Sequence, residues 1–232
     1  MNLTERTTYD MGPYGVDIKV HSILINIENI KDRASEMIAV IQDICWLKEL
    51  DPVAKLSYEA RAERTIEKLV DNILTKVEDE VTEEFGEFMI SASAQDALVS
   101  AFNHIKIPLA ELLKEKISGN PGFDFHTETN KNLIAFGEAK FSGSTNPYRN
   151  ALEQIRKFID LKKHDAELVD LKNFVSEEAV GNHLGKKSAY VAAFSINSKN
   201  PSQIIANALD SKYMKSVFDQ EEVYLIGVTV ND

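Results

Sequence analysis

The spacing of apolar residues changes along the chain and divides its first half into predicted strands and helices. Val16–Val20 alternates between apolar and polar positions and Ser22–Ile27 continues the run, so the first 30 residues contain a predicted strand region. From Ile30 to about Ile44, and again from about Ser57 to Val81, apolar residues recur every three or four positions, as they do on one face of a helix. A third helix is predicted from Glu83 to Ile107.

The second half alternates strands with helices. A Pro-Gly turn and a short strand holding Asp124 are followed by an apolar strand over Leu133–Lys140 and by an amphipathic helix whose apolar face spans Ala151–Ile159. Ser188–Ile196 and Glu222–Val230 are near-continuous apolar runs, which are typical of strands buried on both faces. A helix over Ser202–Lys215 lies between them. We therefore predict an α/β fold with a mixed central sheet flanked by helices.

This pattern divides the chain into two regions. Residues 1–80 are expected to form a strand pair followed by helices, a largely helical N-terminal part that could dock a partner, and residues 81–232 are expected to form the core domain. The single cysteine, Cys45, excludes an internal disulfide and fits a reducing cytosol. Since we find neither a secretion signal nor a membrane-length apolar run, we expect a cytoplasmic protein without membrane segments.

Candidate chemistry is concentrated between Asp124 and Lys140. Hydrolysis of a phosphodiester needs a divalent cation, and carboxylate oxygens of Asp124 and Glu138 suit Mg²⁺ or Mn²⁺. Glu138 and Lys140 are two positions apart in a predicted strand, so their side chains emerge on the same face. The Lys140 ammonium would then lie beside the metal-bound water or the phosphate and offset the negative charge of the transition state.

An acid two positions before a lysine is a weak signal by itself, because the chain contains four others, which begin at Asp17, Asp160, Asp170 and Asp210. Three of these lie in helical or polar stretches, where side chains two apart diverge. Only Glu138 has an apolar strand before it, an acid 14 positions upstream and a helix with polar residues after it.

These residues resemble the motifs of the PD-(D/E)xK nuclease superfamily, the fold of many restriction enzymes. Asp124 resembles the first acidic position, although Pro121 is separated from it by two residues, and Glu138-Ala139-Lys140 matches the second motif. The resemblance implies a restriction-endonuclease-like core, a helical Gln154 that holds DNA or water over the site, and a third metal ligand from the preceding helix. Glu87 is our choice for that ligand, with Glu84 as the alternative.

A narrower resemblance rests on the long helical approach, the Gly86-Glu87 pair and the overall size. In these features the chain resembles the nuclease subunit of the Hachiman antiphage defence system, which implies a DNA-degrading effector restrained by a helicase partner. Two alternatives stay open: a stand-alone restriction-type endonuclease, and a non-catalytic nuclease-like module that binds DNA or protein.

The charge balance limits how the chain could bind DNA. With 26 Lys and Arg against 37 Asp and Glu, the formal net charge is −11, whereas proteins that bind DNA unaided usually present a basic surface. A local basic groove or a partner would have to supply the affinity. Arg149, Arg156 and Lys157, which follow the motif, are the candidate nucleic-acid-binding residues, and a solvated helix face is their alternative interpretation.

Two other kinds of site are not expected. Gly181–Ser188, in a polar stretch from Lys172 to Lys187 with loop character, superficially resembles a phosphate-binding loop, but its glycine spacing is one residue short and a strand follows where a helix is needed. We therefore expect no intrinsic ATP site. His183 with His126 or His164 shows no spacing of zinc ligands, so a structural zinc site is not expected either.

Overall fold

A computed structural model describes residues 1–76, 81–113 and 122–230, with side chains for all of these except 72–76. The predicted Pro-Gly turn at Pro121 and the predicted apolar Val77 therefore fall outside the described residues. The strands are β1 (Asn2–Tyr9), β2 (Lys19–Ile27), β3 (Ile105–Lys106), β4 (Phe125–Glu128), β5 (Ile134–Lys140), β6 (Ala189–Ser195) and β7 (Glu222–Val230).

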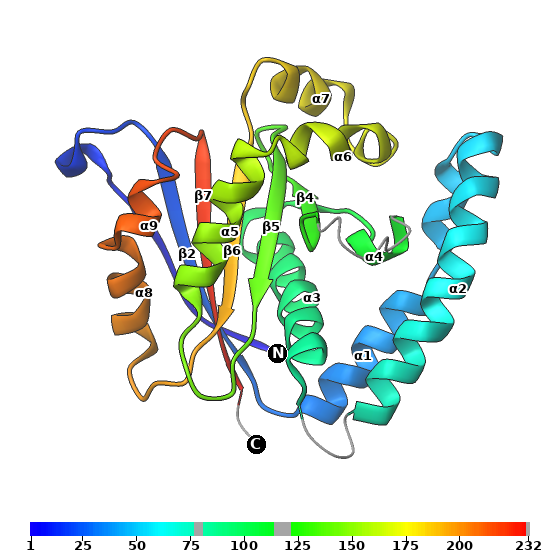
Figure 1. Ribbon diagram of the computed structural model, residues 1–232, viewed down its shortest axis with the longest axis horizontal. Coiled ribbons are helices and arrows are strands. Elements are labelled where there is room, and N and C mark those ends of the chain that lie inside the picture. The colour runs from blue at the N-terminus through cyan, green and yellow to red at the C-terminus, as the bar shows by residue number, and fades with distance from the viewer. Residues whose placement is uncertain (77–80, 114–121, 231–232) are drawn as a thin grey trace.

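The described strands form one seven-stranded mixed sheet in the order β1-β2-β7-β6-β5-β4-β3. The four central strands, β2, β7, β6 and β5, are parallel to one another, while the outer strands on both sides pair in antiparallel fashion. Helices cover both faces of the sheet (Figure 1). The prediction of an α/β fold with a mixed sheet flanked by helices is confirmed.

The N-terminal part differs from its prediction. The predicted strand pair is present as β1 and β2, and β2 pairs along its whole length with β7, from Lys19 opposite Glu222 to Ile27 opposite Val230. The expectation of a largely helical N-terminal part is therefore wrong for this stretch. Most of β2 is buried because it has a neighbour on each side and helices above and below.

The helices follow the predicted order with shifted ends. They are α1 (Ile30–Gln42), α2 (Pro52–Lys76), α3 (Glu83–Phe102), α4 (Ala110–Leu113), α5 (Tyr148–Asp160), α6 (Lys163–Leu171), α7 (Glu177–Leu184), α8 (Pro201–Leu209) and α9 (Lys212–Lys215), with short 3-10 turns at Gly12–Tyr14 and Cys45–Glu49. No helix in the described ranges is both long enough and apolar enough to cross a membrane.

Two of these helices show why the predicted boundaries were inexact. α3 stops five residues early because Asn103 adopts a left-handed conformation (φ 55°) and ends the helix, after which β3 begins. The stretch expected to be a loop contains α7, whose first turn is capped by the Ser176 hydroxyl. The buried Glu128 accepts hydrogen bonds from the Ser176 backbone N–H (2.8 Å) and hydroxyl (2.6 Å), which fixes the start of α7 against β4.

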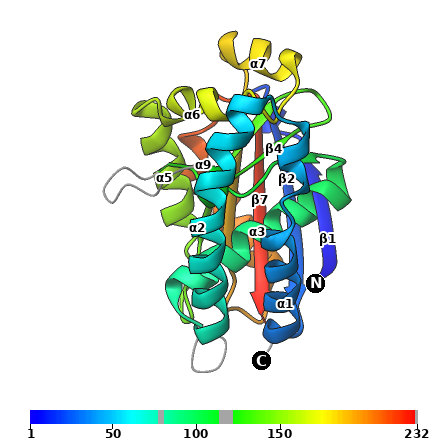
Figure 2. The same ribbon diagram turned by 90° about the vertical axis from the view of Figure 1, so that its right-hand side faces the viewer.

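The two faces of the sheet carry separate apolar cores. One core joins the sheet to α5, α8 and α9, and the other joins it to α1 and α3. α3 is buried on nearly all sides because it lies against the sheet on one side and against α1 on the other, and its many small residues allow this close packing. Figure 2 shows α1 and α2 standing side by side in front of α3 and the sheet.

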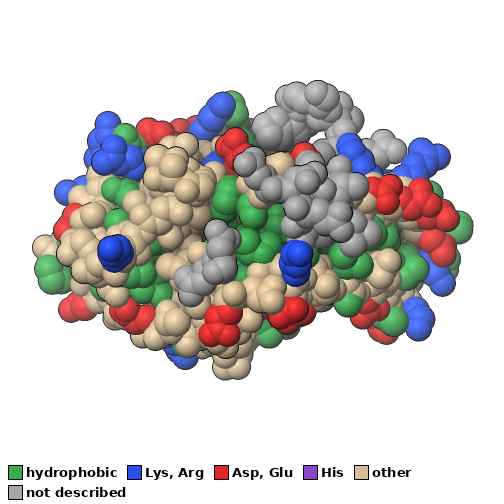
Figure 3. All heavy atoms as spheres, turned by 90° about the horizontal axis from the view of Figure 1, so that it is seen from below, with side chains coloured by type: hydrophobic (Ala, Val, Ile, Leu, Met, Phe, Trp, Pro, Cys, Tyr) green, Lys and Arg blue, Asp and Glu red, His purple; other side chains and the backbone are tan. Residues whose placement is uncertain are grey.

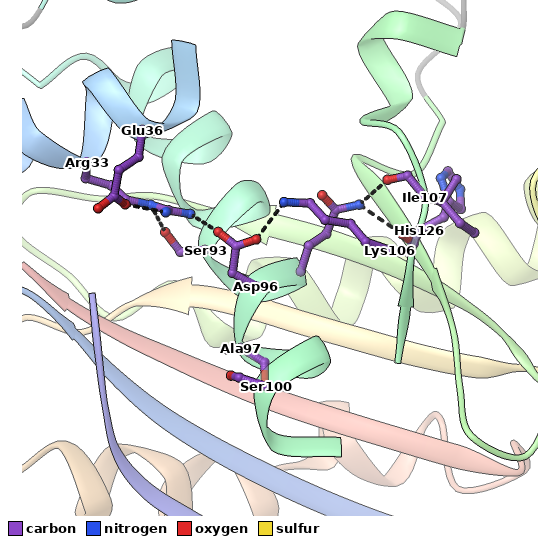
Figure 4. Close-up of polar contacts among 10 residues, drawn as sticks. Arg33, Glu36, Ser93, Asp96, Ala97, Ser100, Lys106, Ile107 and His126 are labelled. Atoms are coloured by element: carbon purple, nitrogen blue, oxygen red, sulfur yellow. Dashed lines mark hydrogen bonds and ion pairs between the residues drawn. The ribbon is translucent and has the colours of Figure 1, made fainter. Parts of the chain in front are cut away.

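A chain of charges joins α1, α3 and β3 (Figure 4). The buried Arg33 guanidinium lies 2.6 Å from one carboxylate oxygen of Asp96 and donates to the Ser93 hydroxyl at 3.0 Å. The other Asp96 oxygen accepts from the Lys106 ammonium at 2.6 Å. Because both cations share one carboxylate of α3, this network fixes α3 relative to the elements on either side of it.

Candidate active site

The β4–β5 pair places Asp124 against the backbone of β5. The Asp124 N–H donates to the Gly137 carbonyl at 2.9 Å, and the Asp124 carboxylate accepts from the Ala139 N–H at 2.8 Å. Gly137 permits this approach because a Cβ there would lie 2.3 Å from the ring of Phe125. Asp124 lies one residue before β4 rather than within a strand, and the two backbone contacts hold its carboxylate beside the end of β5.

Glu138 is a fully buried carboxylate whose partner is a lysine. Its exposed fraction is 0%, and apart from the Lys140 ammonium neither carboxylate oxygen has a polar partner among the described residues. The nearest cation is the Lys140 ammonium, 2.7 Å from one oxygen. Burial first, and the Asp124 charge second, raise the pKa of Glu138 well above its usual 4.5. A buried carboxylate of this kind is costly to the fold and is characteristic of functional sites.

Lys140 lies among three carboxylates at the end of β5. Its ammonium is 2.7 Å from Glu138 and 3.1 Å from Glu87, and it donates to the Ala139 carbonyl at 3.0 Å. Burial would lower the pKa of Lys140, but the charges of Glu138, Asp124 and Glu87 outweigh burial and raise this pKa above its usual 10.5. Lys140 is therefore a permanent cation.

Glu87 reaches the cluster from α3, on a different part of the chain. Its neighbour Gly86 packs against Phe141, so closely that a Cβ would lie 2.2 Å from the ring. About two turns later on α3, the buried Gln95 amide donates to the carbonyls of Ile107 and His126, both at 2.9 Å (Figure 4). These contacts fix α3 against β4 and β5. The pKa of Glu87 is raised, mainly because its side chain is partly buried.

The structure thus brings Asp124, Glu138, Lys140 and Glu87 together, and it makes Glu87 the α3 carboxylate that contacts the lysine. The cluster holds three carboxylates and only one ammonium, so its carboxylate oxygens fit a hard divalent cation such as Mg²⁺. The oxygens of these carboxylates do not lie as close to one another as the ligands of a single ion do. The reason is that the Lys140 ammonium lies between Glu138 and Glu87.

Gln154 is not joined to this cluster by any contact in the described residues. It lies on α5, half-buried, while the motif residues lie at the ends of β4 and β5. The proposed contact of Gln154 with DNA or water therefore stays a prediction.

The three candidate nucleic-acid-binding residues, all on α5, differ in their surroundings. Arg149 is exposed and lines a polar cleft of about 380 Å³ together with Asn146, Asn150 and Asn207. Arg156 is held by Asp160 and lies 3.0 Å from Asp219, so its charge is already balanced within the protein. Lys157 is exposed and has no such ion pair in the described part of the chain.

Figure 3 views the molecule from the carboxyl ends of β5, β6 and β7. Lys and Arg side chains are dispersed over this face among Asp and Glu rather than gathered into one broad basic patch. The local groove of positive charge that an unaided DNA-binding protein would need is therefore not visible on this face.

The sequence analysis did not identify the residues that hold the loop after Lys140. The Ser195 hydroxyl donates to the Ser142 carbonyl at 3.0 Å, and the Asn197 side chain donates to the carbonyls of Ser142 and Thr145 at 2.7 and 2.8 Å. These contacts tie the loop between β5 and α5 to the end of β6. The only signal in the sequence was the position of Ser195 and Asn197 at the carboxyl end of an apolar strand, where site residues gather in α/β proteins.

No model of a known protein family matches the chain, and a search of curated proteins finds no significant match.

Proposed function

We propose that this protein is a metal-dependent nuclease with a restriction-endonuclease-like core. The proposal rests on one observation: the buried Glu138 carboxylate, whose one partner among the described residues is the Lys140 ammonium at 2.7 Å, lies near the end of a central strand with Asp124 and Glu87 beside it. Three carboxylates that share one ammonium are costly to bury for the fold alone. A site that binds a cation and a phosphate does.

Each residue has a distinct role in this proposal. Asp124 and Glu138 would hold Mg²⁺ or Mn²⁺, with Glu87 as the third acidic ligand. The bound cation would polarise a phosphoryl oxygen and make a bound water more acidic. Lys140, kept charged by its neighbours, would face the scissile phosphate and offset the negative charge that develops during attack.

We further propose DNA as the substrate and a helicase as the partner, in antiphage defence. The support is electrostatic: with a net charge of −11 and Arg156 already paired, the chain has little charge with which to bind DNA alone. A partner that delivers DNA would remove this limitation. Arg149, in its polar cleft near the start of α5, is the residue we expect to contact the phosphate backbone.

The test is Mg²⁺-dependent and Mn²⁺-dependent cleavage of supercoiled plasmid and of linear single-stranded DNA. Wild type, Glu138→Gln and Lys140→Met are compared, each alone and with a co-expressed helicase from the same locus. Glu153→Gln, an exposed glutamate of α5, is the matched control. We expect cleavage by wild type and by the control only. Absence of cleavage by every protein, with partner and metal present, would refute the nuclease proposal.

A non-catalytic nuclease-like module is the second candidate. The observation that favours it is that the Lys140 ammonium already has two carboxylates and a carbonyl as partners, as a structural ion pair would. A structural pair predicts that Lys140→Met destabilises the fold by roughly 3 kcal/mol or more. Retained binding of DNA or of the partner without cleavage, together with this loss of stability, would favour the module.

A further inference from the structure

Two histidines from α6 and α7 meet around one carboxylate, at the other end of the sheet from the acidic cluster. Nε2 of His183 lies 3.1 Å from Oδ1 of Asp165, and Nε2 of His164 lies 3.4 Å from the same oxygen. The two imidazole rings are 5.4 Å apart, and the potential ligand atoms of all three residues lie within 4.8 Å of one another. His164 and Asp165 are neighbours in the chain, but His183 reaches them only because the fold brings α7 to α6, so the sequence does not mark the three as one group.

The distances from Asp165 to the two histidines fit ligands that share one ion. Bonds of about 2.0–2.1 Å from zinc to nitrogen or oxygen place two tetrahedral ligands about 3.3 Å apart. The separations of Asp165 from His183 and from His164 lie on either side of that value. A hydrogen bond would account for the shorter contact alone, whereas the 3.4 Å contact is too long for a good one.

His164 has an unmet polar requirement. Its Nδ1 is buried and has no hydrogen-bond partner among the described residues, and its Nε2 lies 3.4 Å from Asp165, which is too far for a good hydrogen bond. Neither ring nitrogen of His164 therefore makes a good hydrogen bond within the described ranges, which leaves the ring available as a ligand.

His183 has the support that a metal ligand needs. Its Nδ1 lies 2.8 Å from the Ser188 hydroxyl, which fixes the ring and leaves Nε2 directed at Asp165. Phe136 packs beside both imidazole rings, with centroid separations of 5.5 and 6.0 Å. The Asp165 side chain is 53% exposed, so an ion can reach the group from solvent.

We propose that His164, Asp165 and His183 bind a divalent transition-metal ion of the Zn²⁺ type, with three protein ligands and a fourth position open to water. Two imidazoles and one carboxylate suit such an ion, whereas the carboxylate oxygens of the cluster at the other end of the sheet suit Mg²⁺. The ion links the start of α6 to the end of α7. α7 in turn is tied to the turn before β5, because the Asn182 amide donates to the Asn132 carbonyl at 2.9 Å. The site would therefore have a structural role, in which the ion holds α6 and α7 together at the amino ends of β5 and β6. This role does not depend on the proposed nuclease activity.

The test uses Co²⁺ as a spectroscopic probe and Zn²⁺ as a competitor, on untagged protein. A Cys45→Ser background removes the exposed thiol as a competing ligand. Asp165→Asn and His164→Gln are the test variants, and Glu178→Gln, an exposed acid of α7, is the control. We expect one equivalent of Co²⁺ to give the intense visible bands of a four-coordinate site and to be displaced by Zn²⁺; Co²⁺ at the acidic cluster would not give these bands. Each test variant should weaken binding by about 100-fold or more, while the control binds like wild type.

Thermal unfolding gives a second readout. Zn²⁺ at about 100 times its Kd should raise the melting temperature by roughly 5–10 °C in wild type and not in Asp165→Asn. Glu138→Gln should keep the Co²⁺ spectrum, because its change lies at the other end of the sheet. The proposal is overturned if wild type binds no Co²⁺, if Asp165→Asn and His164→Gln bind it as wild type does, or if Glu138→Gln abolishes the spectrum.

Discussion

Glu138 and Glu222 are both buried in the same sheet, yet their side chains have opposite surroundings. Glu222, at the start of β7, accepts from the Lys131 ammonium and from the Tyr224 hydroxyl at 3.0 Å, and lies 3.9 Å from the His21 imidazole. Burial alone would raise its pKa, but these partners outweigh burial and lower the pKa of Glu222 to about 2. Glu138, near the end of β5, has only the shared Lys140 ammonium, and its pKa is raised.

These surroundings mean that the ionised Glu222 carboxylate stabilises the fold, whereas the ionised Glu138 carboxylate destabilises it. Glu222 gains stability from being ionised, because its partners exist only in the folded state. Ionisation of Glu138 destabilises the fold, since the one Lys140 ammonium does not offset the cost of burial and the repulsion from Asp124. Both residues are buried glutamates, but Glu138 lies deeper and has fewer donors, and these two differences together decide which carboxylate is a candidate for chemistry.

The largest effect that would sharpen this comparison is on cleavage. We expect Glu138→Gln to lower the rate of DNA cleavage by roughly 10²–10³-fold, because the amide removes a charged ligand, whereas Glu222→Gln should cleave at the wild-type rate under conditions where it is folded. Initial rates on plasmid DNA, measured after circular dichroism has verified folding, provide the check. Equal losses in both variants would break the distinction.

The next effect is on stability and belongs to Glu222. A folded pKa of about 2 against the usual 4.5 corresponds to about 3 kcal/mol of stability at neutral pH, which Glu222→Gln should lose. This stabilisation is present above pH 4.5 and disappears as pH falls to about 2. Urea unfolding from pH 7 to pH 2 should therefore show the variant and wild type converging in acid. Glu221→Gln, the exposed neighbour, should follow wild type throughout.

A smaller effect is expected at Gly86, which positions Glu87. Gly86→Ala would force the Phe141 ring away from α3 and should cost about 1–3 kcal/mol of unfolding free energy, with a parallel loss of cleavage as Glu87 moves from Lys140. Gly143→Ala, in the loop that follows, meets nothing within 4 Å and should change neither quantity. Chemical denaturation of both variants tests this, and a stable, active Gly86→Ala would count against the packing argument.

The smallest expected effect is on the pH dependence of stability in Glu138→Gln, measured without metal. Because the pKa of Glu138 is raised, wild type should lose stability as pH rises above 4.5, and the variant should lack this slope. At pH 7 we expect the free energy of unfolding of the variant to be higher than that of wild type, or lower by no more than about 1 kcal/mol. Urea midpoints at pH 5 and pH 8 measure the slope, and a variant that is strongly destabilised at both would show that Glu138 is a structural residue.

The sequence pattern predicted the strands and helices of the core well, because each has a clear period. β5, β6 and β7 are apolar runs, and α5 has a regular apolar face. It could not predict that β2 lies between β1 and β7, because an apolar strand does not specify its neighbours. Nor could it predict α7, whose residues are mostly polar and whose start is fixed by Glu128, far away in the chain.

The part of the candidate site that lies on or beside the strands was predictable from strand geometry. Glu138 and Lys140 emerge together because they are two positions apart in a strand, and Asp124 precedes the neighbouring strand. Glu87 was chosen by resemblance and not by any local rule, and its contact depends on the packing of α3. The meeting of His164 with His183 was not predictable, since it depends on how α6 and α7 pack together.

The pairing of β2 with β7 has a consequence for how the protein is made. β2 is among the first elements to leave the ribosome, but its inner neighbour begins only at Glu222. At typical rates of synthesis this delay is roughly ten seconds or more, during which one edge of β2 and one edge of β6 lack their partner. Sheets with such distant pairings fold slowly. We expect the central sheet to close only after β7 has emerged, so a nascent chain that stops before Glu222 would not complete its central sheet.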